Sequence, residues 1–332
     1  MKVSPEMIGE PRLKQKQIQW PQLWLKVKKV LMGRNDKAGW IPQIIKYILL
    51  ITLGFVFLYP LIYMLVTSFK SLDDLLNTGI KWLPSKLYLQ NYKQAFAVLD
   101  IRQSLLGSIL ISFIPTIFQV VVCGIVGYGF ARFEFPFKRT LFVLLIFSFI
   151  VPPQITMMPT YVLYSDLDLL GKLSAFIIPA ALGNGIKSAI FILIYYQFFR
   201  QTPNSLYEAA EVDGASEWTC FIKVGVPMAV PAIIIVFLFS CVWYWNETYL
   251  VTLYLRSQGG SKWSTVLTQL QSFKAQYASM ASSASTGAVV DKLNEGITMA
   301  ATMITIIPLL ITYFALQKYF VESVDRSGIT GE

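Results

Sequence analysis

Six long apolar segments set the solvent in which this chain folds. A helix needs about 20 apolar residues to cross a bilayer, and the chain contains six segments of roughly that length or more. The uncharged run in each is long, except that Lys187 interrupts the fourth. The segments comprise residues 44–67, 105–131, 141–163, 175–199, 224–250 and 297–317.

These segments predict transmembrane helices. They are solidly apolar and lack the alternating pattern of strands in a membrane barrel. Lipid offers no hydrogen-bond partner to free backbone groups, so each crossing segment is expected to be an α-helix. Hydrophobic residues make up 55% of the chain and charged ones 14%, against about 25% charge in soluble domains. We therefore predict an all-α membrane protein with six transmembrane helices.

Basic residues predict the orientation of the chain. Nine Lys and Arg lie within residues 1–43, and the loop after the second segment adds three more. Cytoplasmic loops carry an excess of Lys and Arg. We therefore expect both termini and residues 200–223 in the cytoplasm, with 68–104 and 251–296 on the outer side of the membrane.

Several chemistries lack the residues that they need. The chain has no His, which excludes a His-based zinc site, a Ser-His triad and a His proton relay. Its three cysteines are scattered and form no metal spacing, and no G-x-x-x-x-G-K-[ST] phosphate loop is present. The net charge of +9 is concentrated beside the apolar segments, which indicates lipid rather than nucleic acid. We expect no catalytic residue, metal site or bound cofactor in this chain.

The cytoplasmic segment 202–231 reads TPNSLYEAAEVDGASEWTCFIKVGVPMAVP. Thr202 is a suitable N-cap and Pro203 suits the first position of a helix. Gly214 can take the left-handed conformation that ends a helix, and Ser216 can cap the next one. The segment therefore predicts two short helices joined by a turn.

The first of these helices presents a surface suited to docking. Ala209 and Ala210 are small and let another backbone come close. Glu208 and Glu211 offer charge to a basic partner. A compact, small-faced helix that projects from the membrane fits contact with another protein.

This segment resembles the cytoplasmic signature of ATP-binding-cassette importer permeases. That signature is E-A-A, three residues, G, nine residues and I-x-L-P. Here it appears as Glu208-Ala209-Ala210, then Gly214, then VGVP at 224–227, with Val in place of Ile and Leu. WLPS at 82–85, DGAS at 213–216 and WNE at 245–247 extend the resemblance to carbohydrate permeases, in particular the shorter permease of maltose-type importers.

The resemblance implies a multi-pass protein of the bacterial inner (plasma) membrane and a division of labour among subunits. In that family two permeases pair as a heterodimer, two ATPase subunits bind on the cytoplasmic side, and a sugar-binding protein docks outside. ATP and Mg are bound by the ATPase, and the signature loop forms a coupling helix that enters a cleft of the ATPase. The coupling residues that the resemblance implies are Glu208, Ala209, Ala210, Asp213 and Gly214.

The same reasoning divides the chain into three parts. Residues 1–43 form a cytoplasmic segment, in which 20–32 reads as an interfacial helix. Residues 44–320 form the six-span permease domain, with the coupling loop at 202–227. Residues 321–332 form a cytoplasmic tail.

Lys187 is the charge deepest within an expected span. A buried ammonium costs roughly 3 kcal/mol or more on membrane-insertion scales, so we expect it to face water or another subunit. It either contacts a sugar hydroxyl or an acidic sugar, or extends to the outer membrane surface. Aromatic residues near the end of the fifth span either stack on sugar rings or form an interfacial belt. The candidate substrate path comprises Lys187, Trp243, Trp245, Asn246 and Glu247.

An ion-coupled secondary transporter is the alternative from another class. It predicts internal repeats and ionisable residues buried in several spans. Neither is evident in the sequence, and only Lys187 qualifies as a deeply placed ionisable group. A membrane-embedded enzyme is a third possibility, but the polar groups within the spans form no clear acid–base set.

Overall fold

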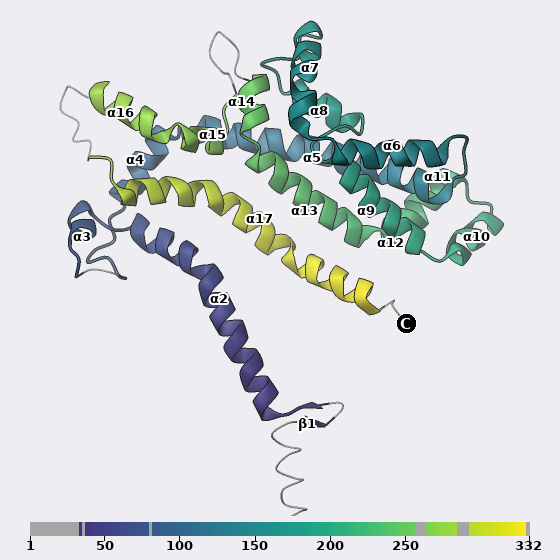
Figure 1. Cartoon of the computed structure of the whole chain (residues 1–332), viewed down its shortest axis with the longest axis horizontal. Helices are drawn as coiled ribbons and strands as arrows, with labels where there is room; N and C mark the ends of the chain where they lie inside the picture. Colours follow the sequence, from purple (N-terminus) through teal and green to yellow (C-terminus); the bar gives the residue numbers. More distant parts are fainter. Residues whose placement is uncertain (1–32, 35–36, 80–81, 256–262, 284–291, 330–332) are drawn as a thin grey trace, which may run out of the picture. The chain divides into compact units, whose positions relative to one another are not determined.

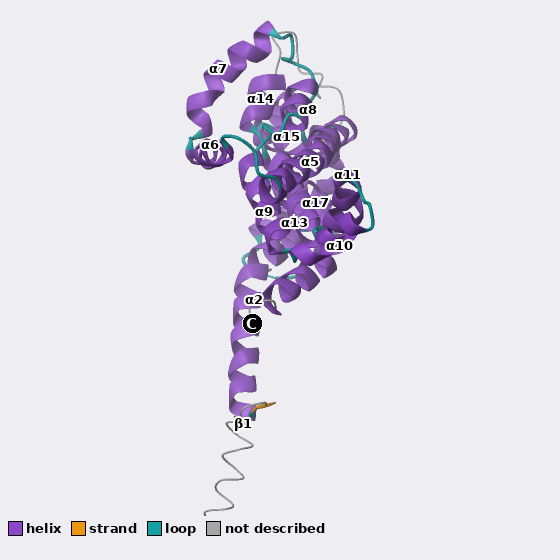
Figure 2. Ribbon diagram, turned by 90° about the vertical axis from the view of Figure 1, so that its right-hand side faces the viewer, coloured by secondary structure: helices purple, strands orange, loops and turns teal. Residues whose placement is uncertain are grey.

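The structure, a computed structural model, describes residues 33–34, 37–79, 82–255, 263–283 and 292–329. Most of these residues are helical, which confirms the all-α prediction (Figures 1 and 2). Among the described residues, one short hairpin pairs β1 (Gly33–Arg34) with β2 (Lys37–Ala38) in antiparallel fashion. The interfacial helix expected at 20–32 lies outside the described residues.

The chain divides into two units, Met1–Tyr63 and Met64–Glu332. The first unit contains the hairpin and most of α2 (Trp40–Ser68), a helix of 29 residues whose last part belongs to the second unit. Apolar side chains occur around the whole circumference of α2, as expected of a helix that lipid or other helices surround. Pro60 lies within this helix.

The second unit is built around α5 (Ile101–Arg132), a helix of 32 residues (Figure 1). Small hydroxyl residues recur along it at a spacing of four, and all of them are buried. Residues at this spacing share one face of a helix, and small residues let helices approach closely within a membrane. The helices packed against α5 include α8 (Ser174–Ala181), α9 (Ser188–Gln201), α13 (Val230–Asn246) and α15 (Val266–Gln271). The hydroxyl residues are Ser104, Ser108, Ser112 and Thr116.

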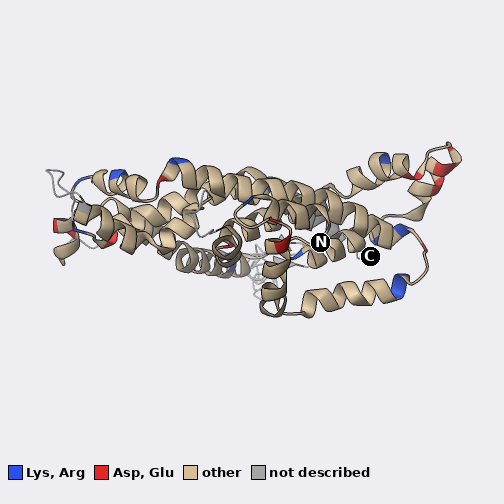
Figure 3. Ribbon diagram, turned by 90° about the horizontal axis from the view of Figure 1, so that it is seen from above, with Lys and Arg blue, Asp and Glu red and all other residues tan. Residues whose placement is uncertain are grey.

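Further helices complete the second unit, in which α17 (Glu295–Ile329) packs against α4 (Gln90–Val98) and α13. Charged residues of this unit lie mainly near helix ends, with long uncharged stretches between them (Figure 3). The further elements are α3 (Leu72–Leu76), α4 (Gln90–Val98), α6 (Lys138–Ile150), α7 (Pro153–Asp166), α10 (Asn204–Val212), α11 (Glu217–Cys220), the π-helix η1 (Phe221–Gly225), α12 (Val226–Met228), α14 (Tyr249–Leu255), α16 (Phe273–Ser283) and α17 (Glu295–Ile329).

Three helices of the described part are long and apolar enough to cross a membrane: α2, α5 and the Glu295–Lys318 part of α17. The number rises to as many as five if each of two bent helix pairs is one span. The pair α6 and α7 bends by 99°, and the pair Glu217–Met228 and Val230–Asn246 bends by 74°. Six crossings therefore remain a prediction.

Three expected spans are not continuous helices. Residues 141–163 are divided between α6 and α7 at Pro152, and a proline disfavours helical backbone in the residue before it. Residues 175–199 are divided between α8 and α9, where Gly183 and Lys187 have φ values of 76° and 59°. Left-handed backbone cannot continue a right-handed helix.

Residues 224–250 are divided at Ala229, between α12 and α13, and again after Asn246, where α13 ends before α14 begins at Tyr249. Pro231, near the start of α13, has no N–H to donate to the carbonyl four residues before it. Hydropathy depends on amino-acid composition alone. The sequence therefore predicted one continuous span in each place where the structure has separate helices.

Candidate coupling loop and charged cavity

The coupling loop, residues 202–227, begins directly after α9. Thr202 donates its hydroxyl proton to the carbonyl oxygen of Phe198 at 3.2 Å, and so closes α9. Pro203 occupies the N-cap position of α10 and makes no side-chain cap bond. The expectation that Thr202 caps α10 was therefore wrong by one residue, because its hydroxyl satisfies a free carbonyl of the preceding helix instead.

The turn after α10 has the predicted geometry. Gly214 has a φ of 80°, which confirms the left-handed conformation. Its N–H donates to the carbonyl of Glu211, and the N–H of Ala215 donates to the carbonyl of Ala210, both at 2.9 Å. Such bonds satisfy carbonyls that a helix leaves free at its end. Ser216 then caps α11, as predicted, by accepting the N–H of Thr219 at 3.3 Å.

The loop exposes both charge and apolar area. Val212 is 87% exposed and Trp218 is 62% exposed. Large apolar side chains that gather at a surface commonly mark a protein interaction site. Ala210 is half-buried against the interior of the protein. The other signature residues are exposed: Glu208, Ala209, Asp213 and Gly214.

Arg132, the last residue of α5, binds three residues of α10. Its guanidinium carbon lies 3.9 Å from the centre of the Tyr207 ring. Its Nη1 donates to Oδ1 of Asn204 at 2.7 Å, and its Nη2 lies 3.8 Å from Oε1 of Glu211. The contacts tie the end of a long helix to the coupling loop. Arg132 is one of the three basic residues in the loop after the second apolar segment, and no local sequence pattern points to these partners.

Tyr207 of α10 belongs to an aromatic cluster, whose other members are Tyr128, Phe199 and Phe221. Tyr207 is fully buried, and its ring lies 6.1 Å from that of Tyr128. The Tyr128 ring lies 5.1 Å from Phe199 and 4.9 Å from Phe221, measured between centroids. Burial raises the pKa of the Tyr207 phenol, so it stays neutral at physiological pH. The cluster connects α5, α9, α10 and η1.

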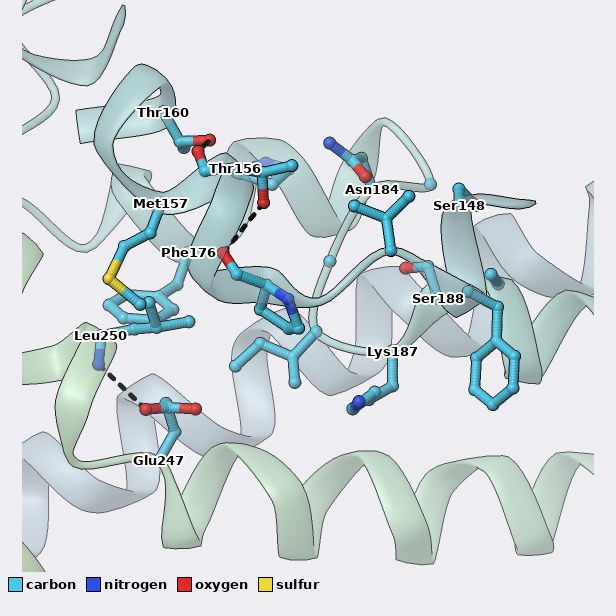
Figure 4. A pocket seen from close by; sticks show the side chains of 18 of the residues that line it. Ser148, Thr156, Met157, Thr160, Phe176, Asn184, Lys187, Ser188, Glu247 and Leu250 are labelled. Carbon is cyan, nitrogen blue, oxygen red and sulfur yellow. Dashed lines mark hydrogen bonds between the residues drawn. The ribbon is translucent and has the colours of Figure 1, made fainter. Parts of the chain in front are cut away.

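A cavity of about 1020 Å³ lies among α6, α7, α8, α9, α13 and α14. Two charged residues line it, Lys187 before the start of α9 and Glu247 after the end of α13 (Figure 4). The carboxylate of Glu247 accepts the N–H of Leu250 at 2.9 Å. Amide and hydroxyl side chains add further polar groups to the cavity lining, and they include Gln154 and Asn184.

The break between α8 and α9 is held by buried hydrogen bonds. Gln119 of α5 donates to the carbonyl of Ile186 at 2.7 Å and to the hydroxyl of Ser188 at 2.9 Å. Ser240 of α13 donates to Oε1 of Gln119 at 2.9 Å. The N–H of Ile186 donates to the hydroxyl of Tyr244 at 3.2 Å. The backbone that precedes Lys187 is therefore fixed by two neighbouring helices.

The expected substrate path is only partly gathered in one place. Lys187 and Glu247 line the cavity, whereas Trp243, Trp245 and Asn246 are not among its lining residues. Trp243 packs on Phe191 with ring centroids 5.1 Å apart. Trp245 is buried, and Asn246 donates to the carbonyl of Val242 at 2.9 Å. Their roles in transport stay a prediction.

Residues 120–326 match the family model of the binding-protein-dependent transport system inner membrane component. The chain belongs to this family. The matched residues include the coupling loop, Arg132 and the charged cavity. Membership makes the chain a transport component of the inner membrane, and it decides against the ion-coupled secondary transporter that the sequence left open.

Several relatives of this inner membrane component are permeases for saccharides. A diacetylchitobiose uptake system permease protein of Streptomyces coelicolor is 29% identical over 282 residues, which cover 85% of this chain and 87% of the relative. A polygalacturonan/rhamnogalacturonan transport system permease protein of Bacillus subtilis is 26% identical over 285 residues, covering 86% and 96%. The similarity extends over almost the whole length of each protein.

A solved structure has the same fold as this inner membrane component. It is a bacterial ATP-binding-cassette transporter involved in the import of the acidic polysaccharide alginate. The TM-score is 0.68 at 21% identity, and the match covers 84% of this chain and 96% of that chain. This likeness shows the permease fold.

Proposed function

We propose that this chain is the permease subunit of an importer that moves an oligosaccharide into the cytoplasm, driven by ATP hydrolysis in separate subunits. The coupling loop carries the proposal, because it combines an exposed E-A-A helix, a glycine turn and a firm attachment to α5 through Arg132. The names of the relatives, which range from diacetylchitobiose to polygalacturonan, support a saccharide as the transported molecule.

Each signature residue has a distinct role in this proposal. Glu208 bonds to or pairs with the ATPase, and Ala209 with Ala210 allows its backbone to approach closely. Gly214, together with Asp213 before it, makes the turn that returns the chain to the membrane. Hydrolysis drives transport only by stabilising one conformation of the permease over another. A rigid connection between α10 and α5 passes that difference to the membrane helices.

The proposal includes the partners and the orientation of the chain. A second permease, two ATPase subunits that hold ATP and Mg, and an external sugar-binding protein complete the transporter. Both termini and the coupling loop lie in the cytoplasm, which the nine Lys and Arg in residues 1–43 support.

Purification of the chain from its native membrane tests the assembly. We expect a stoichiometric ATPase and a second permease to co-purify. After reconstitution, the external binding protein loaded with an oligosaccharide should stimulate ATP hydrolysis. Absence of a nucleotide-hydrolysing partner would refute the proposal.

Cysteine labelling tests the orientation separately. The native cysteines Cys123, Cys220 and Cys241 are all buried, so a single Glu208→Cys substitution reports on its own site. An impermeant thiol reagent should label residue 208 in inside-out vesicles and leave it unlabelled in intact cells. Labelling from outside would place the loop on the wrong side of the membrane for an ATPase contact.

A further inference from the structure

Lys187 has a backbone conformation that glycine adopts more easily. Its φ of 59° lies in the left-handed region, where the Cβ of an L residue is disfavoured. Non-glycine residues in this region persist where their surroundings determine the conformation, and they cluster at functional sites. The position therefore keeps a lysine where the backbone alone would favour glycine.

The surroundings of Lys187 determine that conformation. The two residues on either side of it, Ile186 and Ser188, both bond to Gln119 on α5. Just before them, a Cβ on Gly185 would lie 2.5 Å from the hydroxyl oxygen of Tyr244, so the backbone is packed tightly against α13. The side chain of Lys187 lines the cavity (Figure 4).

The ammonium of Lys187 forms no ion pair with the residues that the structure describes. Within the described part of the chain, no carboxylate lies within 4.0 Å of it. Glu247, the other charged residue of the cavity lining, accepts the N–H of Leu250 at the start of α14. A charged group within a span is costly to bury and usually faces a water-filled path. An anionic group of a passing molecule would supply the charge that the protein does not.

The remaining walls suit a saccharide. Gln154, Asn184 and Thr156 offer amide and hydroxyl groups to sugar hydroxyls. Tyr164 and Tyr254 add aromatic rings, whose centroids lie 5.0 Å apart. Small-molecule sites combine such apolar surface with a few placed polar groups.

We propose that the cavity is a transit site for saccharides that carry a carboxylate, such as uronate oligomers, with Nζ of Lys187 as the carboxylate ligand. This rests on the proposed function, because it presumes that the chain forms part of a sugar path. An ammonium–carboxylate contact is a charge-assisted hydrogen bond, stronger than a bond to a neutral hydroxyl. The site therefore favours the acidic sugar over its methyl ester.

The test compares acidic and esterified sugars in the reconstituted importer. The wild-type complex and a Lys187→Met variant are supplied with a set of uronate trisaccharides and with their methyl esters. We expect Lys187→Met to lower uptake of the acidic sugars by about tenfold or more, the loss expected for a charged hydrogen bond, and to leave the esters within about twofold. Lys187→Arg should retain most uptake of the acidic sugars.

Two controls separate a binding role from a folding role. Lys172→Met removes an exposed lysine that pairs with Asp168 outside the cavity, and uptake of both sugar classes should stay unchanged. Lys187→Gly keeps the backbone conformation while removing the charge. It should assemble normally and lose the acidic sugars alone.

The remaining outcomes overturn the proposal in distinguishable ways. An equal loss of both sugar classes in Lys187→Met and Lys187→Gly, or no loss at all, would refute the carboxylate site. A wild-type complex that imports only neutral saccharides would refute it while leaving the proposed function intact. A wild-type complex that no saccharide stimulates would refute the proposed function itself.

Discussion

The guanidinium of Arg132 lies 3.9 Å from the centre of the Tyr207 ring. Tyr207 is the one buried residue of α10, so α5 holds α10 through the side chain that anchors this helix to the protein. A cation placed over an aromatic ring contributes about 0.5–2 kcal/mol, with the larger value where water is excluded. The pair connects the expected site of ATPase contact to α5, around which the second unit is built.

Loss of Arg132 should uncouple hydrolysis from transport. Arg132→Ala removes the ring contact, the bond to Asn204 and the ion pair with Glu211. We expect the saccharide imported per ATP to fall about tenfold, in line with 1–2 kcal/mol of lost contact, while basal ATPase activity persists. Reconstituted vesicles that report both rates provide the measurement.

Two companion variants sharpen that experiment. Arg132→Lys keeps the charge but lacks the planar, forked donor, so its coupling should be intermediate. Arg139→Ala removes an exposed arginine of α6 and should behave as wild type. If Arg132→Ala couples normally, α10 is held by the aromatic cluster alone.

Gly214 should tolerate asparagine but not valine. Its φ of 80° costs an ordinary L residue about 1–2 kcal/mol, and a β-branched side chain is the least suited to it. No heavy atom lies within 4 Å of the position that a Cβ would take there, so the effect comes from the backbone and not from a clash. Gly214→Val should lower sugar-stimulated ATPase activity and uptake without reducing membrane insertion.

Asparagine provides the matched comparison at this turn. It enters the left-handed region more readily than other residues, so Gly214→Asn should retain most uptake. Equal uptake by the valine and asparagine variants would show that the turn does not depend on its left-handed residue.

Gln119 should stabilise the protein rather than contact the ATPase. Gln119→Leu leaves the carbonyl of Ile186 and two hydroxyls without their buried partner. The expected cost is about 1–3 kcal/mol, seen as a lower midpoint of thermal unfolding in detergent. The same substitution at exposed Gln197 should leave the midpoint unchanged. A Gln119→Leu midpoint equal to that of wild type would mean that water replaces the lost bonds.

Asp74 should make the segment around α3 sensitive to acid. Its carboxylate accepts the hydroxyl and N–H of Ser85 and the N–H of Ser71. The Ser85 hydroxyl bond is the largest cause of a lowered Asp74 pKa. A lowered pKa contributes stability that is complete above the ordinary value of 3.8 and is lost as pH falls through the lowered value.

Hydrogen exchange measures this effect. Amides of residues 82–88 should lose about tenfold of their protection once Asp74 is protonated, because charge-assisted bonds become neutral ones. Asp74→Asn should show the reduced protection at every pH. If the protection of the wild-type segment stays constant from about pH 5 to about pH 2, Asp74 does not have the role assigned to it. These limits lie about one to two units on either side of the ordinary aspartate pKa.

Features that depend on neighbouring residues could be predicted from the sequence. The helical class follows from the length of the apolar segments, and the turn at Gly214 follows from local backbone preference. Ser216 caps α11 through a residue only three positions away. Thr202 was assigned to the wrong helix because it lies between two helix ends and either can use its hydroxyl.

Features that depend on distant residues could not be predicted. Asn204, which Arg132 binds, lies 72 positions further along the chain, and Gln119 bonds to a hydroxyl 121 positions away. No periodicity links such pairs in one sequence. The divisions of 141–163, 175–199 and 224–250 were missed for another reason, since an apolar stretch keeps its composition when its backbone turns.

The backbone at Lys187 has an evolutionary consequence. Glycine would occupy this position more comfortably, so the fold itself exerts no pressure to retain the amine. If the proposed carboxylate site is correct, we expect a permease of this fold that carries only neutral saccharides to accommodate glycine at position 187 without a change in the backbone.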